Sequence, residues 1–302
     1  MGTRSFAGAA LIVAAVGSGC GEGDPSGTNR IAVATTTQVG DLVRNIAGTR
    51  TEVRQVLAPN SDPHDYEPRP SDARAVAAAG VVFRSGGDLD GWLDDLVDSA
   101  GGDAHVVTLL DSVRTRGDDP HWWQDPRNAV RAVGAIRKGL AKADPGGTGI
   151  YARNAASYVK RLRRLDRSVS RCIAQLPPSQ RRLVTTHDAL GYYADRYGIE
   201  VIGALIPSLS TEAQPSAGDT AKLVEQIREQ EVKAIFPERS VNPKLERAVS
   251  REAGARLGEA LWADTLGPEG SSGATYLGSI ASNTTALVEG LSGGSRSCRP
   301  RA

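Results

Sequence analysis

Short apolar runs alternate with helical patterns along most of the chain, and this alternation constrains the fold more than any other feature. The apolar runs predict strands at 30–37, 52–57, 81–84, 105–110, 183–186, 200–206, 233–236 and 256–262. Apolar residues at helical spacing predict helices at 41–47, 71–79, 92–97, 128–141, 189–197, 217–230, 243–253 and 273–291, the second of them capped by Ser71 and Asp72. Strands and helices in this order predict parallel sheets that are covered by helices on both faces.

One stretch, residues 148–175, departs from the alternation. It is strongly basic, its apolar residues recur at helical spacing, and Pro177 follows it. At ~1.5 Å per residue it predicts a single helix of roughly 40 Å. We therefore predict an α/β protein with two lobes, each a mostly parallel sheet flanked by helices, which are joined by one long rigid helix. The expected boundaries are 30–147 and 177–292 for the lobes, 148–176 for the linker helix and 293–302 for a tail.

The start of the chain has the features of an export signal. Arg4 is followed by an apolar run at 6–16 that is too short to span a bilayer as a mature helix. We expect residues 1–20 to be the signal peptide, and a Cys after small residues resembles a lipoprotein processing site, with Cys20 as the lipidated N-terminus. Simple secretion is the alternative. Residues 21–29 would then be a flexible tether.

Charge and cysteine content restrict the class of partner and the compartment. The formal net charge is +1 and the charges are interspersed, so no basic stripe indicates nucleic acid, and a small ligand fits better. Cys172 and Cys298 form an even pair in what should be an oxidising compartment, which makes a disulfide between them plausible. Two unrelated thiols remain the alternative, because the sequence contains no distance between them.

A repeated motif indicates a metal site. Asp62-Pro63-His64 and Asp119-Pro120-His121 each present an imidazole on a Pro-fixed loop, in a chain with four His in all. His187 ends one predicted strand and Asp264 follows another. Ligands of open α/β sheets bind beyond the carboxyl ends of the strands, so these four side chains are expected in the cleft between the lobes. Three neutral imidazoles and one carboxylate suit a d-block dication such as Zn²⁺.

Four motifs in order resemble one family, the metal-binding component of bacterial zinc/manganese ABC transporters. They are Ser61-Asp62-Pro63-His64-Asp65-Tyr66-Glu67-Pro68, Asp119-Pro120-His121-Trp122 with Asp125-Pro126, Thr186-His187-Asp188-Ala189 with Tyr192-Tyr193, and Phe236-Pro237-Glu238-Arg239-Ser240-Val241-Asn242-Pro243-Lys244 followed by Ala263-Asp264-Thr265-Leu266-Gly267. The resemblance runs from about Arg30 to Leu291. It implies two α/β lobes joined by a rigid helix, with metal held between them and delivered to a membrane permease that a cytoplasmic ATPase drives.

The resemblance also indicates which metal the site binds. The third motif has His187 where manganese-binding members often have Glu, and residues 114–118 stand where many zinc-specific members carry a His-rich loop. We expect His64, His121, His187 and Asp264 to bind zinc, with Mn²⁺ or Fe²⁺ as the alternative metals. The expected protein is a monomer, located periplasmically or on the cell surface, that touches the membrane through Cys20 and does not bind nucleic acid.

Other readings of the same residues stay open. Asp264 could instead cap a helix, and Glu238 could accept a hydrogen bond from a ligand His or be a turn residue. His105 lacks a motif and is expected to be an ordinary hydrogen-bonding residue. Glu67 and Asp125 are expected to brace their loops rather than bind metal.

Two further functional classes compete with metal capture. A hydrolase is disfavoured, because no Gly-x-Ser-x-Gly elbow and no His-Glu-x-x-His motif occur, and four protein ligands would leave a tetrahedral metal no position for water. A surface adhesin is the other alternative, since an anchored binding protein can also touch host or cell-wall partners.

Overall fold

Two parallel sheets form the framework of the protein. The computed structural model describes residues 1–3, 30–101 and 104–302, so Cys20, the predicted tether and the signal sequence from residue 4 onward lie outside the described residues. The first sheet has the strand order β2-β1-β3-β4 and the second has the order β6-β5-β7-β8, with every neighbouring pair parallel. The predicted fold class is confirmed.

The elements follow one another in the predicted order. In the first half they are β1 (Ile31–Ala34), α1 (Thr37–Ala47), β2 (Glu52–Gln55), α2 (Pro70–Ala77), β3 (Val81–Arg84), α3 (Trp92–Ala100), β4 (His105–Thr108) and α4 (Pro126–Ala143). The long helix is α5 (Thr148–Ile173). In the second half they are β5 (Arg182–His187), α6 (Gly191–Tyr197), β6 (Glu200–Ile206), α7 (Ala217–Glu229), β7 (Ala234–Phe236), α8 (Lys244–Ala253), β8 (Arg256–Leu257) and α9 (Tyr276–Leu291).

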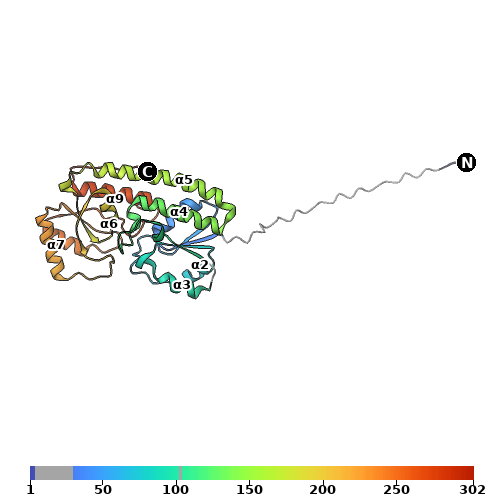
Figure 1. Ribbon diagram of the computed structural model, residues 1–302, viewed down its shortest axis with the longest axis horizontal. Coiled ribbons are helices and arrows are strands. Elements are labelled where there is room, and N and C mark those ends of the chain that lie inside the picture. The colour runs from blue at the N-terminus through green and yellow to red at the C-terminus, as the bar shows by residue number, and fades with distance from the viewer. Residues whose placement is uncertain (4–29, 102–103) are drawn as a thin grey trace.

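Successive side chains of a strand point to opposite sides of the sheet, and in the inner strands β3 and β7 the side chains on both sides are buried. In β3, Val81 and Phe83 pack in the same core as α1, α4 and α5, whereas Val82 packs with residues of α2 and α3. In β7, Phe236 packs with α9 and Ile235 packs with α7 and α8. This period of two places a helical layer on each face of both sheets (Figure 1).

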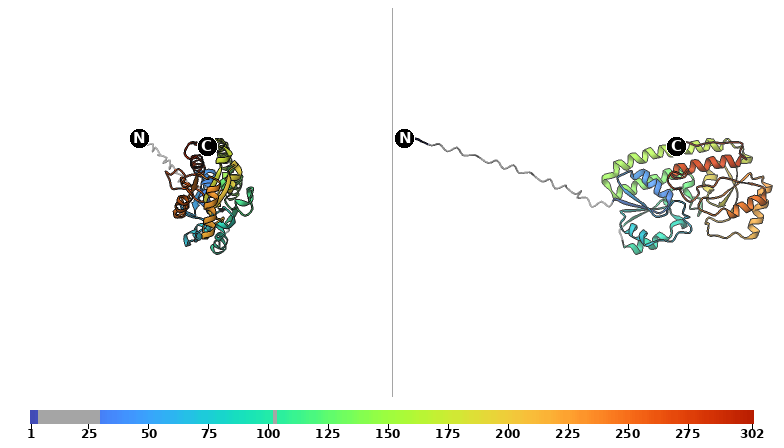
Figure 2. Two further views of the ribbon diagram at one scale, coloured as in Figure 1. Left: turned by 90° about the vertical axis from the view of Figure 1, so that its left-hand side faces the viewer. Right: turned by 180° about the vertical axis from the view of Figure 1, so that it is seen from behind.

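Helix α5 runs along both lobes and shares one continuous core with them. Its buried residues Tyr151, Leu162 and Ile173 belong to a cluster that also contains Phe83 of the first sheet and Phe236 of the second. The helix lies along the top of the molecule above α4 and α9, and the view from behind agrees (Figures 1 and 2). Within the described residues, no helix is long and apolar enough to cross a membrane.

Three local predictions differ from the structure. The strand predicted at 256–262 is limited to β8 and one isolated bridge between Glu238 and Leu261, because Pro237 has no N–H with which to continue the ladder. Helix α2 begins at Pro70, so Asp72 lies inside its first turn and accepts the Arg69 N–H at 2.7 Å instead of preceding the helix as a cap. The linker helix ends at Ile173 rather than at residue 176.

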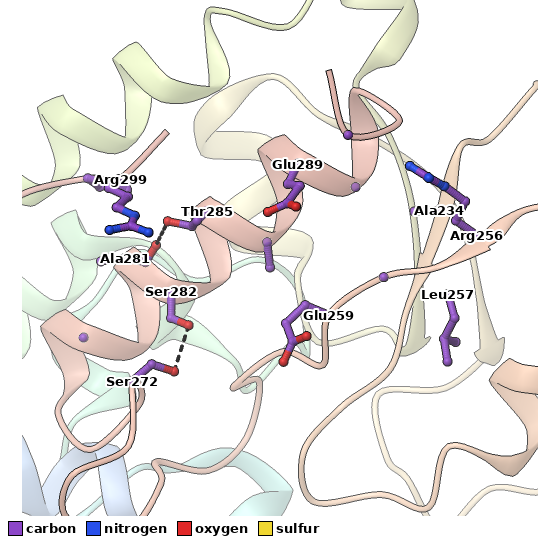
Figure 3. A pocket seen from close by; sticks show the side chains of 16 residues that line it. Ala234, Arg256, Leu257, Glu259, Ser272, Ala281, Ser282, Thr285, Glu289 and Arg299 are labelled. Carbon is purple, nitrogen blue, oxygen red and sulfur yellow. Dashed lines mark hydrogen bonds between the residues drawn. The ribbon is translucent and has the colours of Figure 1, made fainter. Parts of the chain in front are cut away.

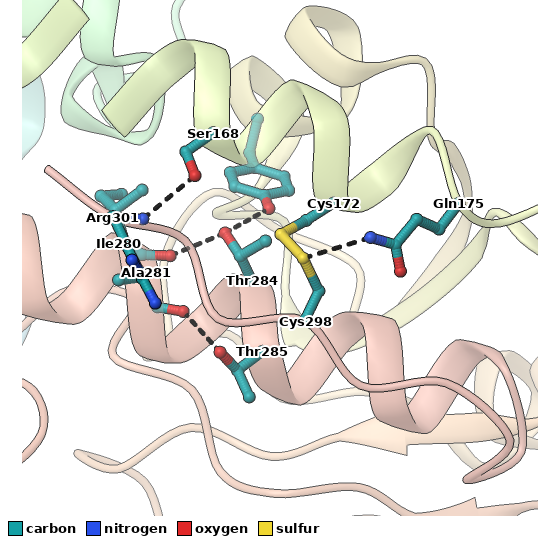
Figure 4. The surroundings of a disulfide bond; sticks show 10 residues. Ser168, Cys172, Gln175, Ile280, Ala281, Thr284, Thr285, Cys298 and Arg301 are labelled. Carbon is teal, nitrogen blue, oxygen red and sulfur yellow. Dashed lines mark hydrogen bonds between the residues drawn. A yellow bond between two sulfur atoms is a disulfide. The ribbon is translucent and has the colours of Figure 1, made fainter. Parts of the chain in front are cut away.

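A disulfide joins the C-terminal tail to the long helix. Cys172 near the end of α5 is bonded to Cys298, with the Cα atoms 5.6 Å apart, so the disulfide interpretation is confirmed over two separate thiols. The tail continues along the helix, and the Arg301 N–H donates to Ser168 Oγ at 3.0 Å (Figure 4). The residues after α9 are therefore fastened to α5 at two points.

Cys298→Ser should lower the free energy of unfolding by roughly 2–4 kcal/mol, because the bond closes a long loop in the unfolded chain. Chemical denaturation under non-reducing conditions measures this difference. Ser297→Ala changes the exposed neighbouring residue and should unfold like the wild type. Titration of free thiols at both Cys172 and Cys298 in unfolded, unreduced protein would contradict the prediction.

Candidate metal centre

Four side chains from separate parts of the chain meet between the lobes. His64 lies in the loop after β2, His121 in the loop between β4 and α4, His187 at the last position of β5, and Asp264 in the loop after β8. One ligand atom from each lies within 4.8 Å of the corresponding atoms of the other three. The two parallel sheets thus direct the loops beyond their carboxyl ends to one point, as the sequence predicts.

The distances between these atoms match the edges of a metal coordination shell. His187 Nε2 lies 3.0 Å and His64 Nε2 lies 3.2 Å from Asp264 Oδ2. His121 Nε2 lies 3.5 Å from Asp264 Oδ1 and 3.3 Å from His187 Nε2. Ligands at about 2.0–2.1 Å from one zinc ion in a tetrahedron would lie ~3.3–3.4 Å apart. A six-coordinate shell at about 2.2 Å would have edges of ~3.1 Å, so these distances accommodate either geometry.

The Asp264 carboxylate is buried without satisfied hydrogen bonds. Its side chain has 0% exposure, and neither oxygen accepts a hydrogen bond of normal geometry from the described residues. His64 Nε2 is likewise buried and unsatisfied. A buried, ionised carboxylate is costly unless a cation compensates it. The alternative role of Asp264 as a helix cap is wrong, because α9 begins only at Tyr276 and has Thr275 as its N-cap.

Two carboxylates orient two of the imidazoles. Asp119 Oδ1 lies 2.8 Å from His121 Nδ1, and Glu238 Oε1 lies 2.8 Å from His187 Nδ1. In the neutral imidazole each pair favours the ring proton on Nδ1, so that the Nε2 atom, which faces Asp264, is the one available to bind a metal. Glu238 is therefore the hydrogen-bond acceptor of a site His rather than a simple turn residue.

The repeated Asp-Pro-His motif has a common local geometry. The Asp62 carboxylate accepts the His64 N–H at 3.0 Å, and the Asp119 carboxylate accepts the His121 N–H at 2.9 Å. An Asp that bonds the backbone two residues later forms a tight turn, and the intervening Pro restricts it further. The motif thus fixes the direction in which each imidazole leaves the loop.

Asp264 is positioned mainly by residues of the first lobe that none of the motifs marks as part of the site. The Ala263 carbonyl accepts hydrogen bonds from Trp123 Nε1 at 2.9 Å, Gln124 Nε2 at 2.9 Å and Gln38 Nε2 at 3.5 Å. The Leu266 N–H donates to Thr37 Oγ1 at 2.8 Å. The only sequence signal was that Trp123 and Gln124 directly follow the second His motif.

The His187 imidazole and the Asp264 carboxylate each shift the pKa of the other. Burial of the His187 ring opposes its protonation, but the Glu238 and Asp264 carboxylates outweigh burial and hold its pKa well above the usual range. Burial likewise opposes ionisation of Asp264, but His187 and His121 hold its pKa well below the usual range. The centre therefore favours a positive charge, which a proton or a metal ion can supply.

The other candidate residues lie outside this group. Asp125 caps α4 and pairs with Arg127 at 2.7 Å, so it braces its loop as predicted. Glu67 is exposed. His105 begins β4 and is half-buried, and burial followed by the charge of Lys142 lowers its pKa.

A separate hollow lies on the second lobe, away from the four side chains. It has a volume of about 790 Å³ and runs between β8 and α9 (Figure 3). Arg256, Glu259, Glu289 and Arg299 are its charged lining residues, and the lining contains no His or Cys. It therefore lacks the nitrogen and sulfur ligands of a transition-metal site.

The sequence profile of the family described as zinc-uptake complex component A, periplasmic (ZnuA), matches residues 32–290. The chain belongs to this family. The manganese-binding lipoprotein MntA of Halalkalibacterium halodurans is 31% identical over 293 residues, which cover 93% of this chain and 96% of that protein. The iron-binding protein YfeA of Yersinia pestis is 29% identical over 286 residues, which cover 89% of each chain.

A solved metal-binding protein has the same fold. The periplasmic zinc binding protein TroA of Treponema pallidum superposes with a TM-score of 0.81 at 28% identity, covering 87% of this chain and 99% of that chain. MntA, YfeA and TroA are all named as metal-binding proteins and not as enzymes, so the expectation of a binding protein rather than a hydrolase is confirmed. The predicted family is confirmed, whereas the names of the relatives differ in the metal.

Proposed function

We propose that this protein captures a divalent transition metal outside the cytoplasm and delivers it to the permease of an ABC importer. The observation that carries the proposal is the convergence of three Nε2 atoms on a fully buried carboxylate whose oxygens lack hydrogen bonds from the described residues. The ligands of this proposal are His64, His121, His187 and Asp264. Membership in the ZnuA family supports the role in transport.

The proposed cargo is Zn²⁺. Three imidazole nitrogens and one carboxylate match the preference of zinc for nitrogen-rich, four-ligand shells, whereas manganese prefers more oxygen ligands. The metals in the relatives' names do not decide the matter, since they include manganese, iron and zinc.

The exposed fractions of the four side chains indicate where the metal enters the site. The His64 side chain is 5% exposed, whereas those of His121, His187 and Asp264 are 0% exposed. We infer that the metal enters and leaves on the side of His64. The proposed first lobe comprises residues 30–147 and the proposed second lobe comprises residues 177–292, with the site between them. The protein would act as a monomer, with the permease and its cytoplasmic ATPase as partners.

Metal stoichiometry tests the proposal directly. Purified chain from residue 30 onward, stripped by chelator and titrated with Zn²⁺ in a calorimeter, should bind one ion per chain. Elemental analysis of protein from its native envelope should show the same ratio. Absence of stoichiometric binding would refute the proposal, and turnover of esters or peptides by the loaded protein would restore the hydrolase alternative.

Metal affinity should fall as the pH falls. His ligands bind metal only in the neutral form, and the raised pKa of His187 means that a metal must displace its proton even above roughly pH 6.5. Binding at pH 7 should therefore release protons, which calorimetry in buffers of different ionisation enthalpy measures. Asp264 has no proton to lose in this range because its pKa is depressed. An affinity independent of pH between roughly 5 and 7.5 would contradict the three-His site.

The proposed anchor is lipid on Cys20. Cys20→Ala should move the protein from the membrane fraction to the soluble fraction, because the chain would lose the thiol that carries the lipid. Fractionation and immunoblotting of cells that express either form measure the distribution. Ser297→Ala, which leaves every cysteine in place, is the control and should remain in the membrane fraction. A wild-type protein found only in the soluble fraction would mean simple secretion.

A further inference from the structure

Arg116 connects the loop that carries His121 to the opposite lobe. This loop belongs to the first lobe, and Arg116 Nε donates to Asp195 Oδ2 on α6 at 2.9 Å. The Arg116 N–H donates to the Tyr192 hydroxyl at 2.8 Å, and the same hydroxyl donates to the Asp119 carbonyl at 3.1 Å. Helix α6 follows β5, the strand that ends at His187. Arg116 therefore spans the two segments that present His121 and His187.

The same guanidinium reaches the carboxylate that orients His121. Arg116 Nη1 donates to Asp119 Oδ2 at 3.3 Å, while Asp119 Oδ1 accepts both the ring Nδ1–H and the backbone N–H of His121. The two carboxylate oxygens are thus divided between Arg116 and His121. A shift of the guanidinium would rotate or shift Asp119 and, with it, the imidazole.

Gly191 supplies the space for this arrangement. A Cβ atom at Gly191 would lie 2.5 Å from Arg116 Nη1 and 2.9 Å from Asp119 Oδ2, closer than carbon and these atoms can approach. Gly191 is the first residue of α6. Because alanine is favourable in a helix, Gly191→Ala should preserve α6 while it displaces the guanidinium.

The two ion pairs of Arg116 differ in expected strength. The Asp195 side chain is 68% exposed, so its pair with Arg116 is screened by solvent and contributes little. The Asp119 side chain is 1% exposed, so its contact with Arg116 is screened much less. The function of Arg116 should therefore depend on Asp119 more than on Asp195.

We propose that Arg116 is a positioning residue of the metal centre, which acts through Asp119 to hold His121 in its ligating orientation and so slows the release of bound metal. This inference rests on the proposed function and deepens it. Partners that orient a metal-binding His typically change metal affinity by about 10–100-fold when removed. Arg116 lies one contact further from the ring, so Arg116→Gln should accelerate metal release by about tenfold, at the lower end of that range.

The experiment measures Zn²⁺ release into excess chelator by stopped flow, together with the visible absorption spectrum of the Co²⁺-loaded protein. Arg116→Gln and Gly191→Ala should both release metal about tenfold faster than wild type and change the Co²⁺ spectrum. Arg116→Lys should release metal more slowly than Arg116→Gln but faster than wild type, because lysine keeps the charge without the planar fork. Asp195→Asn should stay within about twofold of wild type. Arg114→Gln, which removes the same charge from an exposed position of the same loop, should also stay within about twofold.

The results of these measurements distinguish the proposed role of Arg116 from the proposed capture of metal. Wild-type release and an unchanged Co²⁺ spectrum in both Arg116→Gln and Gly191→Ala would overturn the role of Arg116 while leaving metal capture intact. Equal acceleration by Arg114→Gln would also overturn it, since it would indicate a general charge effect. If Asp195→Asn equals Arg116→Gln, the action through Asp119 is wrong. If the wild-type protein binds no Zn²⁺ or Co²⁺, both proposals fail together.

Discussion

His64→Ala should weaken Zn²⁺ binding by roughly 10²–10³-fold. Structural zinc sites of zinc-finger peptides, with four protein ligands, have apparent binding free energies of about 10–16 kcal/mol, so one ligand of four accounts for about 2.5–4 kcal/mol, at ~1.4 kcal/mol per tenfold. His64 is the best ligand to remove, because its side chain is the most exposed of the four and the fold should tolerate its loss. Competition with a chromophoric chelator measures the affinity.

His105→Ala is the matched control for this substitution. His105 is the one His of the chain that lies outside the converging group, and it is half-buried at the start of β4. Its replacement should leave the affinity within about twofold of wild type, and thermal unfolding of both metal-free variants reports any loss of folding. A loss of less than about tenfold for His64→Ala, or an equal loss for His105→Ala, would remove His64 from the ligand set.

The wild-type protein should prefer Zn²⁺ to Mn²⁺ by at least about a hundredfold, on the order of 3 kcal/mol. A nitrogen-rich site favours zinc on intrinsic affinity, and manganese gains more from carboxylate ligands. His187→Glu exchanges one nitrogen for oxygen and should narrow the ratio. Competition calorimetry with both ions, on wild type and variant, measures it.

The position of Asp264 limits this preference. Its Oδ2 faces His64 and His187 while its Oδ1 faces His121 at 3.5 Å, so both oxygens are directed at the centre and bidentate binding would raise the coordination number. Three imidazole nitrogens and two carboxylate oxygens make five ligand atoms, and a shell of more than four ligands suits manganese or iron. Equal affinities of the wild type for Zn²⁺ and Mn²⁺ would support that geometry. An unchanged ratio in His187→Glu would mean that His187 does not set selectivity.

The order of the elements and the class of the fold could be predicted from local patterns in the chain. Period-two and helical spacing are local properties of the chain, so β3, α4 and the long helix α5 could be read from it to within a few residues. The Asp-Pro-His turns are also local, because the hydrogen bonds from His64 to Asp62 and from His121 to Asp119 span two residues. The candidate ligands followed from these turns and from the strand ends.

The contacts that hold the metal centre in place could not be predicted from the chain, because they join residues far apart in the sequence. The donors that fix the Ala263 carbonyl, Gln38 and Gln124, are separated from it by more than a hundred residues, and Arg116 meets Asp195 across the lobes. The short length of β8 also depends on its neighbouring strand, because Pro237, which follows the end of β7, has no N–H with which to pair. No local pattern encodes such contacts, because each one exists only when both lobes have packed against α5 and brought distant side chains within a few ångströms.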